Sequence, residues 1–205
     1  SEAVRTMVAL EDLYRPYRPK RRTRATIAKE KGLEPLAEIL RAQATTRTIE
    51  EEATAFVDAE KGVESVQDAI DGAKDILAEV YADDADYRTK LRAMTKESGS
   101  LVAKAKDEEA DSVYEMYYDF SEPIKKLVGH RILAINRGEA EKFLTVKIEA
   151  PRQEILLWLV KQIIGNMKHD SASYLYEAIT DSYDRLIAPS IEREIRNELP
   201  EKAEV

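Results

Sequence analysis

The 205-residue sequence contains no cysteine. The chain therefore has no disulfide bond, no thiolate metal site and no thiol nucleophile, and we expect a reducing, cytoplasmic location. Histidine occurs only twice, and the acidic group Asp83, Asp84 and Asp86 lacks the glycine-containing spacing of a calcium loop. We therefore interpret that group as a solvated helix junction and expect neither a metal site nor a cofactor.

Long apolar segments are also missing from the sequence. The longest uninterrupted apolar run, Ile155 to Val160, has six residues, whereas a membrane-spanning helix needs about 20. No signal peptide, with a charged start followed by an apolar stretch, opens the chain. We expect a soluble protein that makes no contact with a membrane.

Glycine and proline number only seven each, and apolar residues make up 43% of the chain. This composition favours one folded, helix-rich unit, because such a sequence can bury enough apolar surface to offset the chain entropy. A predicted helix begins almost at Ser1, and the last residues also have helical composition. We therefore expect the chain to be an excised segment of a longer protein.

The net charge of -8 is distributed unevenly along the chain. Between Arg15 and Lys31 there are eight basic residues and one acidic residue, a formal charge of +7, which leaves -15 for the remainder. The average charge argues against a general nucleic-acid binder. This local concentration instead marks one cationic segment attached to an acidic body.

Apolar residues recur at intervals of three and four through most of the chain, which predicts amphipathic helices. Gly32 is expected to end one helix, and Pro35 and Pro151 are each expected to start one. The helix from Pro151 is apolar on nearly every side and is predicted to be the buried centre of the fold. The predicted helical segments are 3–14, 23–32, 35–42, 49–62, 66–81, 87–99, a helix closed by Gly138, 151–165, and a final pair over 175–199 that Pro189 divides or kinks.

Three short segments alternate or carry residues typical of strands. Phe143 to Ile148 alternates along its length and predicts a strand, and further short strands are expected near 101–105 and 113–118. The predicted fold class is therefore mostly α, a multi-helix domain with a small β element.

The candidate nucleic-acid-binding segment lies in the cationic region. Pro16 and Pro19 keep its backbone extended, so the side chains spread along an exposed strap. Arginine forks suit phosphate, and interleaved tyrosines offer stacking surfaces for bases. Alternatively, these cations pair with acids of this fold or of a neighbouring domain. The candidate residues, named here the basic strap, are Tyr14, Arg15, Tyr17, Arg18, Lys20, Arg21, Arg22 and Arg24.

A second group of polar residues is a weaker candidate for binding. His130, Arg131 and Arg137 lie on one predicted helix and could bind an anion. In the alternative interpretation they hold helix ends and turns in place.

Catalysis is not expected of this sequence. His169 and Asp170 resemble a catalytic dyad only as adjacent letters, and no serine has the spacing of a triad nucleophile. Ser171 and Ser173 are interpreted as helix caps. We therefore predict that the chain is not an enzyme.

Four blocks of sequence, in order, resemble the bacterial Tex family of transcription accessory proteins. They are LEDLYRPYRPKRRTR with ATIAKEKGLEPLA at 10–37, FVDAEKGVESVQDAIDGAKDIL at 56–77, FSEPIKKLVGHRILAINRGE at 120–139, and LIAPSIEREIRNEL at 186–199. Together the blocks span nearly the whole chain.

The resemblance implies that residues 1–205 are the N-terminal helical domain of a multidomain relative of a eukaryotic transcription-elongation factor. RNase H-like, helix-hairpin-helix and OB-type RNA-binding domains would follow in the longer protein and are absent from this sequence. It also implies a non-catalytic scaffold whose partners are RNA or DNA in the full-length protein, the downstream domains and the transcription machinery. In the alternative interpretation, the segment is a protein-interaction module that docks on that machinery or on its own downstream domains.

Overall fold

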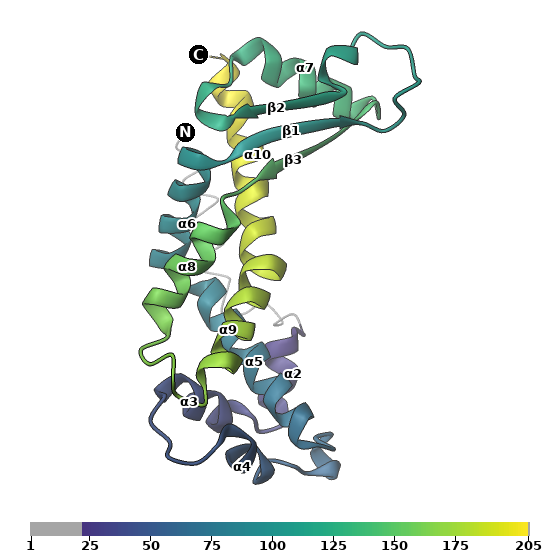
Figure 1. The fold of residues 1–205 in the computed structure, drawn as a ribbon. Helices are drawn as coiled ribbons and strands as arrows, with labels where there is room; N and C mark the ends of the chain where they lie inside the picture. The colour runs from purple at the N-terminus through teal and green to yellow at the C-terminus, as the bar shows by residue number, and fades with distance from the viewer. Residues whose placement is uncertain (1–21, 205) are drawn as a thin grey trace, which may run out of the picture.

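A computed structural model describes residues 22–204 of the chain, with side chains through Pro200 (Figure 1). The predicted helix 3–14 lies outside the described residues. Long helices form an elongated shaft, short helices cover one end of it, and a small sheet lies across the other end. No helix in the described part of the chain is long and apolar enough to cross a membrane.

The first described helices follow the predicted boundaries. Thr23 caps the first one: its Oγ1 accepts from the Thr26 N–H at 3.1 Å, and Thr26 Oγ1 accepts from the Thr23 N–H at 2.7 Å. Pro35 lies in the first turn of the next, where its missing N–H costs no hydrogen bond. These helices are α2 (Arg24–Glu30) and α3 (Glu34–Ala42).

The predicted helix 49–62 is wrong in its second half. Helix α4 (Ile49–Thr54) ends early, and residues 59–61 form a separate 3-10 turn, η2 (Ala59–Lys61). Asp58 and Val63 exchange two backbone hydrogen bonds of 2.8 and 3.0 Å, which closes this segment into a loop of its own.

Two turns with the same pattern, EKG followed by an apolar residue and Glu, pack against each other at 30–34 and 60–64. Gly32 and Gly62 have φ angles of +78° and +85°, which a glycine adopts without strain. In both turns the N–H after the glycine donates to the carbonyl five residues earlier, at 3.2 and 3.0 Å. Lys61 Nζ lies 3.5 Å from the point that a Cβ on Gly32 would occupy, so the lysine stem covers the opposite turn.

The buried centre of the fold is α5 (Val66–Asp83), not the helix from Pro151 as predicted. Helices α2, α3, α4 and α9 (Ala172–Asp181) all pack on α5. Small residues such as Ala69, Gly72 and Ala73 allow this close approach. Helix α8 (Arg152–Ile163) buries only one side, and Leu157 on its other side is 55% exposed.

A three-stranded antiparallel sheet has the order β2-β1-β3. The strand predictions near 101–105 and 143–148 are confirmed by β1 and β3, whereas the prediction near 113–118 is wrong. Tyr114 and Tyr117 are buried three residues apart, a spacing that suits the observed 3-10 turn η3 (Glu115–Tyr117) rather than a strand. The strands are β1 (Ser100–Ala105), β2 (Asp119–Pro123) and β3 (Leu144–Glu149).

Helix α7 (Gly129–Ala140) packs on β3 and on the last helix. Gly138 was expected to end this helix but lies inside it. A Cβ on Gly138 would lie 2.6 Å from Leu144 Cδ1, so the glycine serves close packing rather than helix termination.

The end of the chain is helical without a break, so the division expected at Pro189 does not occur, and the helix instead widens just before that residue. The π-helical segment η5 (Ser182–Ile187) joins α9 (Ala172–Asp181) to α10 (Ala188–Glu204). Proline has no N–H to donate and its ring would clash with the carbonyl four residues earlier, so a widened turn just before Pro189 accommodates it. Ser182 Oγ also donates to the Ala78 carbonyl at 2.6 Å and fixes this segment on α5.

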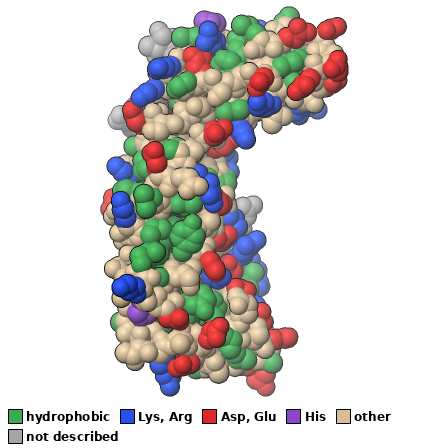
Figure 2. All heavy atoms as spheres, in the orientation of Figure 1, with side chains coloured by type: hydrophobic (Ala, Val, Ile, Leu, Met, Phe, Trp, Pro, Cys, Tyr) green, Lys and Arg blue, Asp and Glu red, His purple; other side chains and the backbone are tan. Residues whose placement is uncertain are grey.

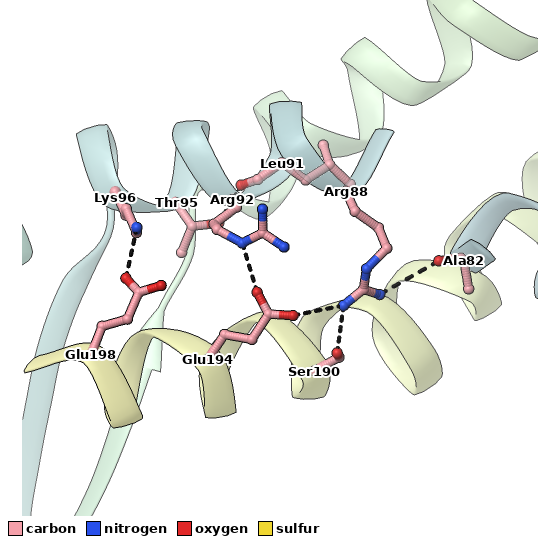
Figure 3. A network of polar contacts seen from close by, with 9 residues as sticks. All are labelled: Ala82, Arg88, Leu91, Arg92, Thr95, Lys96, Ser190, Glu194 and Glu198. Atoms are coloured by element: carbon pink, nitrogen blue, oxygen red, sulfur yellow. Dashed lines mark hydrogen bonds and ion pairs between the residues drawn. The ribbon is translucent and has the colours of Figure 1, made fainter. Parts of the chain in front are cut away.

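Ion pairs join α10 to α6 (Ala85–Ser98) along the shaft (Figure 3). Glu194 accepts from Arg88 at 3.0 Å and from Arg92 at 2.6 Å, and one turn on Lys96 pairs with Glu198 at 2.7 Å. The spacing of four residues on both helices places each cation opposite an acid.

The ion pairs of Glu194 should make part of the free energy of unfolding depend on pH. The hydrogen bond from Arg92 holds the pKa of Glu194 below its ordinary value of 4.5, with Arg88 acting in the same direction against burial. A lowered carboxyl pKa adds stability above the ordinary pKa, and that stability is lost as the pH falls through the lowered value. We expect Glu194→Gln to lower the free energy of unfolding at neutral pH, and the difference from wild type to shrink as the pH falls below the ordinary value of 4.5 and through the lowered one.

Urea unfolding of both proteins at neutral pH and at a pH of about 3 measures this difference. Glu198→Gln, in the more exposed pair with Lys96, is the control. An equal destabilisation by Glu194→Gln at both pH values would contradict the assignment.

Candidate nucleic-acid interface

The structure describes only the last two residues of the basic strap, since residues 14–21 lie outside the described part of the chain. Arg22 Nη2 lies 3.2 Å from Glu30 Oε2, and the Arg22 side chain is still 69% exposed. Arg24 is the first residue of α2 and is exposed. Binding by the strap stays a prediction.

Arg24 faces the acidic side of α5. A cleft of about 230 Å³ beside it also contains Lys31, Asp71 and Asp75. Burial raises the pKa of the Asp75 carboxyl, and the positive charges of Arg185 and Arg24 oppose that rise. At its described end, therefore, the strap has acidic neighbours from its own fold as well as open solvent.

The weaker anion-binding group is already divided between two roles in the fold. Arg131 Nη1 donates to Glu122 Oε2 at 2.8 Å, so the fold already uses this side chain to join α7 to β2. His130 and Arg137 stay exposed on α7. Anion binding by these residues stays a prediction.

His169 and Asp170 join two loops at the end of the shaft. His169 Nε2 lies 2.9 Å from the Thr45 carbonyl oxygen, and Asp170 Oδ2 accepts from the Ile49 N–H at 2.7 Å. Asp170 thereby provides an acceptor for one of the N–H groups at the start of α4 that have no partner within the helix. The two side chains point to the α3–α4 connection and not to a common substrate site.

The serines beside this pair were expected to cap a helix, and that expectation is wrong. Ser171 does occupy the N-cap position of α9, but its side chain makes no hydrogen bond to the helix. Ser171 Oγ lies 2.7 Å from His169 Nδ1 instead. Ser173 lies inside the first turn of α9.

The acidic group at 83–86 forms the junction between α5 and α6, as the sequence predicted. Asp84 Oδ1 accepts from the Tyr87 N–H at 2.9 Å and caps α6. Among the side chains that the structure describes, those of residues 22–200, no three His, Cys, Asp or Glu are grouped so that they could hold a metal ion.

Sequence reasoning missed two features that depend on tertiary contacts. The first is a groove of about 820 Å³ where α7 and β3 meet α10, with Arg196 among the residues that line it. The second is a cleft of about 220 Å³ that contains Arg41, Tyr81, Tyr87 and Gln162. Residues up to 122 positions apart in the sequence, Arg41 and Ile163, form this cleft, so no local pattern could indicate it.

A family model described as Tex central region-like matches residues 44–205. The chain is 47% identical to the protein YdcI of Bacillus subtilis (strain 168) over 95% of this chain and 28% of that protein. It is 32% identical to the transcriptional accessory protein Tex of Neisseria gonorrhoeae, over 99% of this chain and 27% of that protein. It is also 30% identical to the human S1 RNA-binding domain-containing protein 1, over 98% of this chain and 21% of that protein.

The chain thus spans less than a third of the length of these relatives. The family model covers well over half of the chain, and the similarity to the relatives extends over nearly all of it. The sequence resemblance is confirmed: this chain belongs to the Tex family.

Proposed function

We propose that this chain is a non-catalytic helical scaffold of a nucleic-acid-binding transcription accessory factor, and that the basic strap contributes a contact to RNA or DNA. The observation that carries the proposal is the concentration of +7 between Arg15 and Lys31 in a chain of net charge -8. The printed names of two relatives, a transcriptional accessory protein and an S1 RNA-binding domain-containing protein, support the same role.

The described end of the strap also supports this function. Arg22 and Arg24 are exposed, and the only ion pair of Arg22 in the described part of the chain is an exposed one. Exposed pairs of this kind are worth at most about 1 kcal/mol, so a phosphate could replace Glu30 at little cost.

The charge reversal Arg21→Glu/Arg22→Glu tests the strap. Labelled single-stranded RNA and duplex DNA are titrated into the protein at several salt concentrations. For direct phosphate contacts, we expect weaker binding by the variant and a salt slope of log K that is smaller by about two, one for each lost contact.

The control is Lys90→Glu/Lys161→Glu, which changes the net charge equally at two exposed lysines outside the strap. If net charge alone determined the affinity, both double variants would bind nucleic acid equally weakly. If the wild-type protein binds neither nucleic acid at low salt, the strap does not contact nucleic acid and the proposal fails.

A second candidate function is docking on a protein partner. The loop between β1 and β2 exposes Val113 by 84% and Met116 by 70%. Acidic side chains gather at this end of the sheet in Figure 2. Buried Tyr114 and half-buried Tyr118 hold the loop, since Tyr118 Oη donates to the Ala110 carbonyl at 2.6 Å.

This surface would suit a basic partner segment with an apolar anchor. Val113→Ser/Met116→Ser should weaken binding to purified RNA polymerase but leave nucleic-acid binding unchanged. Equal polymerase binding by wild type and variant would exclude this surface.

A further inference from the structure

The small cleft that sequence reasoning missed lies where three helices end. It is formed by the last turn of α3, the junction of α5 with α6, and the last turn of α8, whose lower end lies next to α3 in Figure 1. Gln43 fixes this arrangement, because its Nε2 donates to the Ile163 carbonyl and its Oε1 accepts from the Gly165 N–H, both at 2.9 Å. The residues around the cleft are Arg41, Val80, Tyr81, Asp84, Tyr87, Gln162 and Ile163.

The Tyr81 hydroxyl is buried and has no hydrogen-bond partner among the described residues. Burial raises the pKa of Tyr81, and neighbouring Tyr87 adds to the rise while Arg41 opposes it. The Tyr81 hydroxyl therefore keeps its proton and can donate a hydrogen bond close to Tyr87 and Arg41. A buried donor left unpaired costs free energy, so an acceptor that enters the cleft would stabilise it.

The other groups of the cleft define the ligand. Tyr87 is held by an edge-on contact to Trp158, with ring centroids 5.7 Å apart, and adds an aromatic ring beside apolar Val80 and Ile163. Gln162 provides an amide with no partner in the described part of the chain. The volume of about 220 Å³ lies below the range of roughly 300–1,000 Å³ that suits drug-sized ligands, so it fits a single ring system.

Arg41 supplies a positive charge that can move. Its side chain is mostly exposed, and its only ion pair among the described residues is a 3.5 Å contact to Glu38. The guanidinium is therefore free to turn toward a phosphate at the mouth of the cleft.

We propose that this cleft binds one unstacked nucleobase of a single-stranded nucleic acid. Tyr81 donates to an acceptor on the base edge, Gln162 bonds the same edge, Tyr87 contacts the base ring, and Arg41 binds the adjoining phosphate. Aromatic rings combined with arginine are how proteins commonly hold single strands. The inference rests on the proposed nucleic-acid function and adds a second contact to it.

Tyr81→Phe tests the cleft, because it removes the hydroxyl and keeps the ring. The probes are a labelled oligouridylate and a duplex DNA of equal length. We expect Tyr81→Phe and Gln162→Ala each to weaken binding of the single strand by about fivefold, the effect of one lost hydrogen bond. Duplex affinity and the salt slope should not change, since stacked bases cannot enter the cleft and neither residue is charged.

Tyr176→Phe is the matched control, because Tyr176 is exposed and its hydroxyl makes no hydrogen bond in the described part of the chain. Thermal unfolding should show Tyr81→Phe to be at least as stable as wild type, so weaker binding cannot be assigned to misfolding. If Tyr81→Phe binds the single strand as tightly as wild type while Arg21→Glu/Arg22→Glu binds it more weakly, the proposal for the cleft fails and the proposal for the basic strap stands. If instead Tyr81→Phe binds the single strand more weakly and Arg21→Glu/Arg22→Glu binds as wild type does, the cleft proposal is supported and the strap proposal fails. A wild-type protein that binds neither probe would refute both proposals.

Discussion

Gly72→Val is expected to destabilise the fold by about 2–3 kcal/mol, because the side chain of Leu33, in the turn after α2, packs directly against Gly72 on α5. A Cβ on Gly72 would lie 2.2 Å from Leu33 Cδ1 and 3.3 Å from Ala28 Cβ. Leu33 is buried and packed on all sides, so it cannot move aside without disturbing the core. The slightly better helix propensity of valine over glycine, a few tenths of a kcal/mol, does not offset this overlap.

Urea unfolding followed by circular dichroism measures the effect as a shift of midpoint at constant slope. Gln67→Val, on the exposed side of the same helix, places valine where nothing overlaps it and loses only the exposed 2.7 Å hydrogen bond from Gln67 to Asp71, so it should cost far less than Gly72→Val. Leu33→Ala should partly rescue Gly72→Val, because it removes the group that overlaps. Strictly additive effects of Leu33→Ala and Gly72→Val would show that the two positions do not conflict.

Local patterns in the sequence were sufficient to identify most helices and two of the three strands. Helix periodicity and caps depend on neighbours within one turn, as Thr23 and Pro35 illustrate. The choice of the central helix depends on a different property. Large apolar residues made the helix from Pro151 look central, but neighbours approach α5 because its residues are small.

Tyrosine-rich segments do not by themselves indicate a strand, because the position of a tyrosine also depends on tertiary contacts. Tyr114 and Tyr117 have high strand propensity, yet they pack inward from a 3-10 turn, since their burial depends on tertiary partners such as Phe143 and Phe120. The candidate site shows a similar limit. A run of arginines can be identified from the amino-acid sequence, whereas a cleft formed by three helix ends depends on how those helices pack.

Arg196→Ala is expected to cost about 2 kcal/mol, the range for hydrogen bonds to charged groups at a partly solvated site. The side chain is only 17% exposed and joins three elements. Its Nη2 lies 2.6 Å from Glu139 Oε1 and 3.1 Å from Asn136 Oδ1, and its Nη1 lies 3.3 Å from the Val146 carbonyl oxygen. Since α10 belongs to the shaft while α7 and β3 belong to the sheet end, this residue fixes one against the other.

Arg193→Ala is the matched control, because Arg193 is exposed on the same helix and has no partner among the described residues. Arg196→Lys keeps the charge but not the planar fork, so it should recover only part of the lost stability. Urea midpoints of the three variants measure these differences. Equal midpoints for Arg193→Ala and Arg196→Ala would mean that apolar packing alone holds the sheet end on α10, and the orientation of the sheet would then depend on Ile132, Ile135 and Ile195.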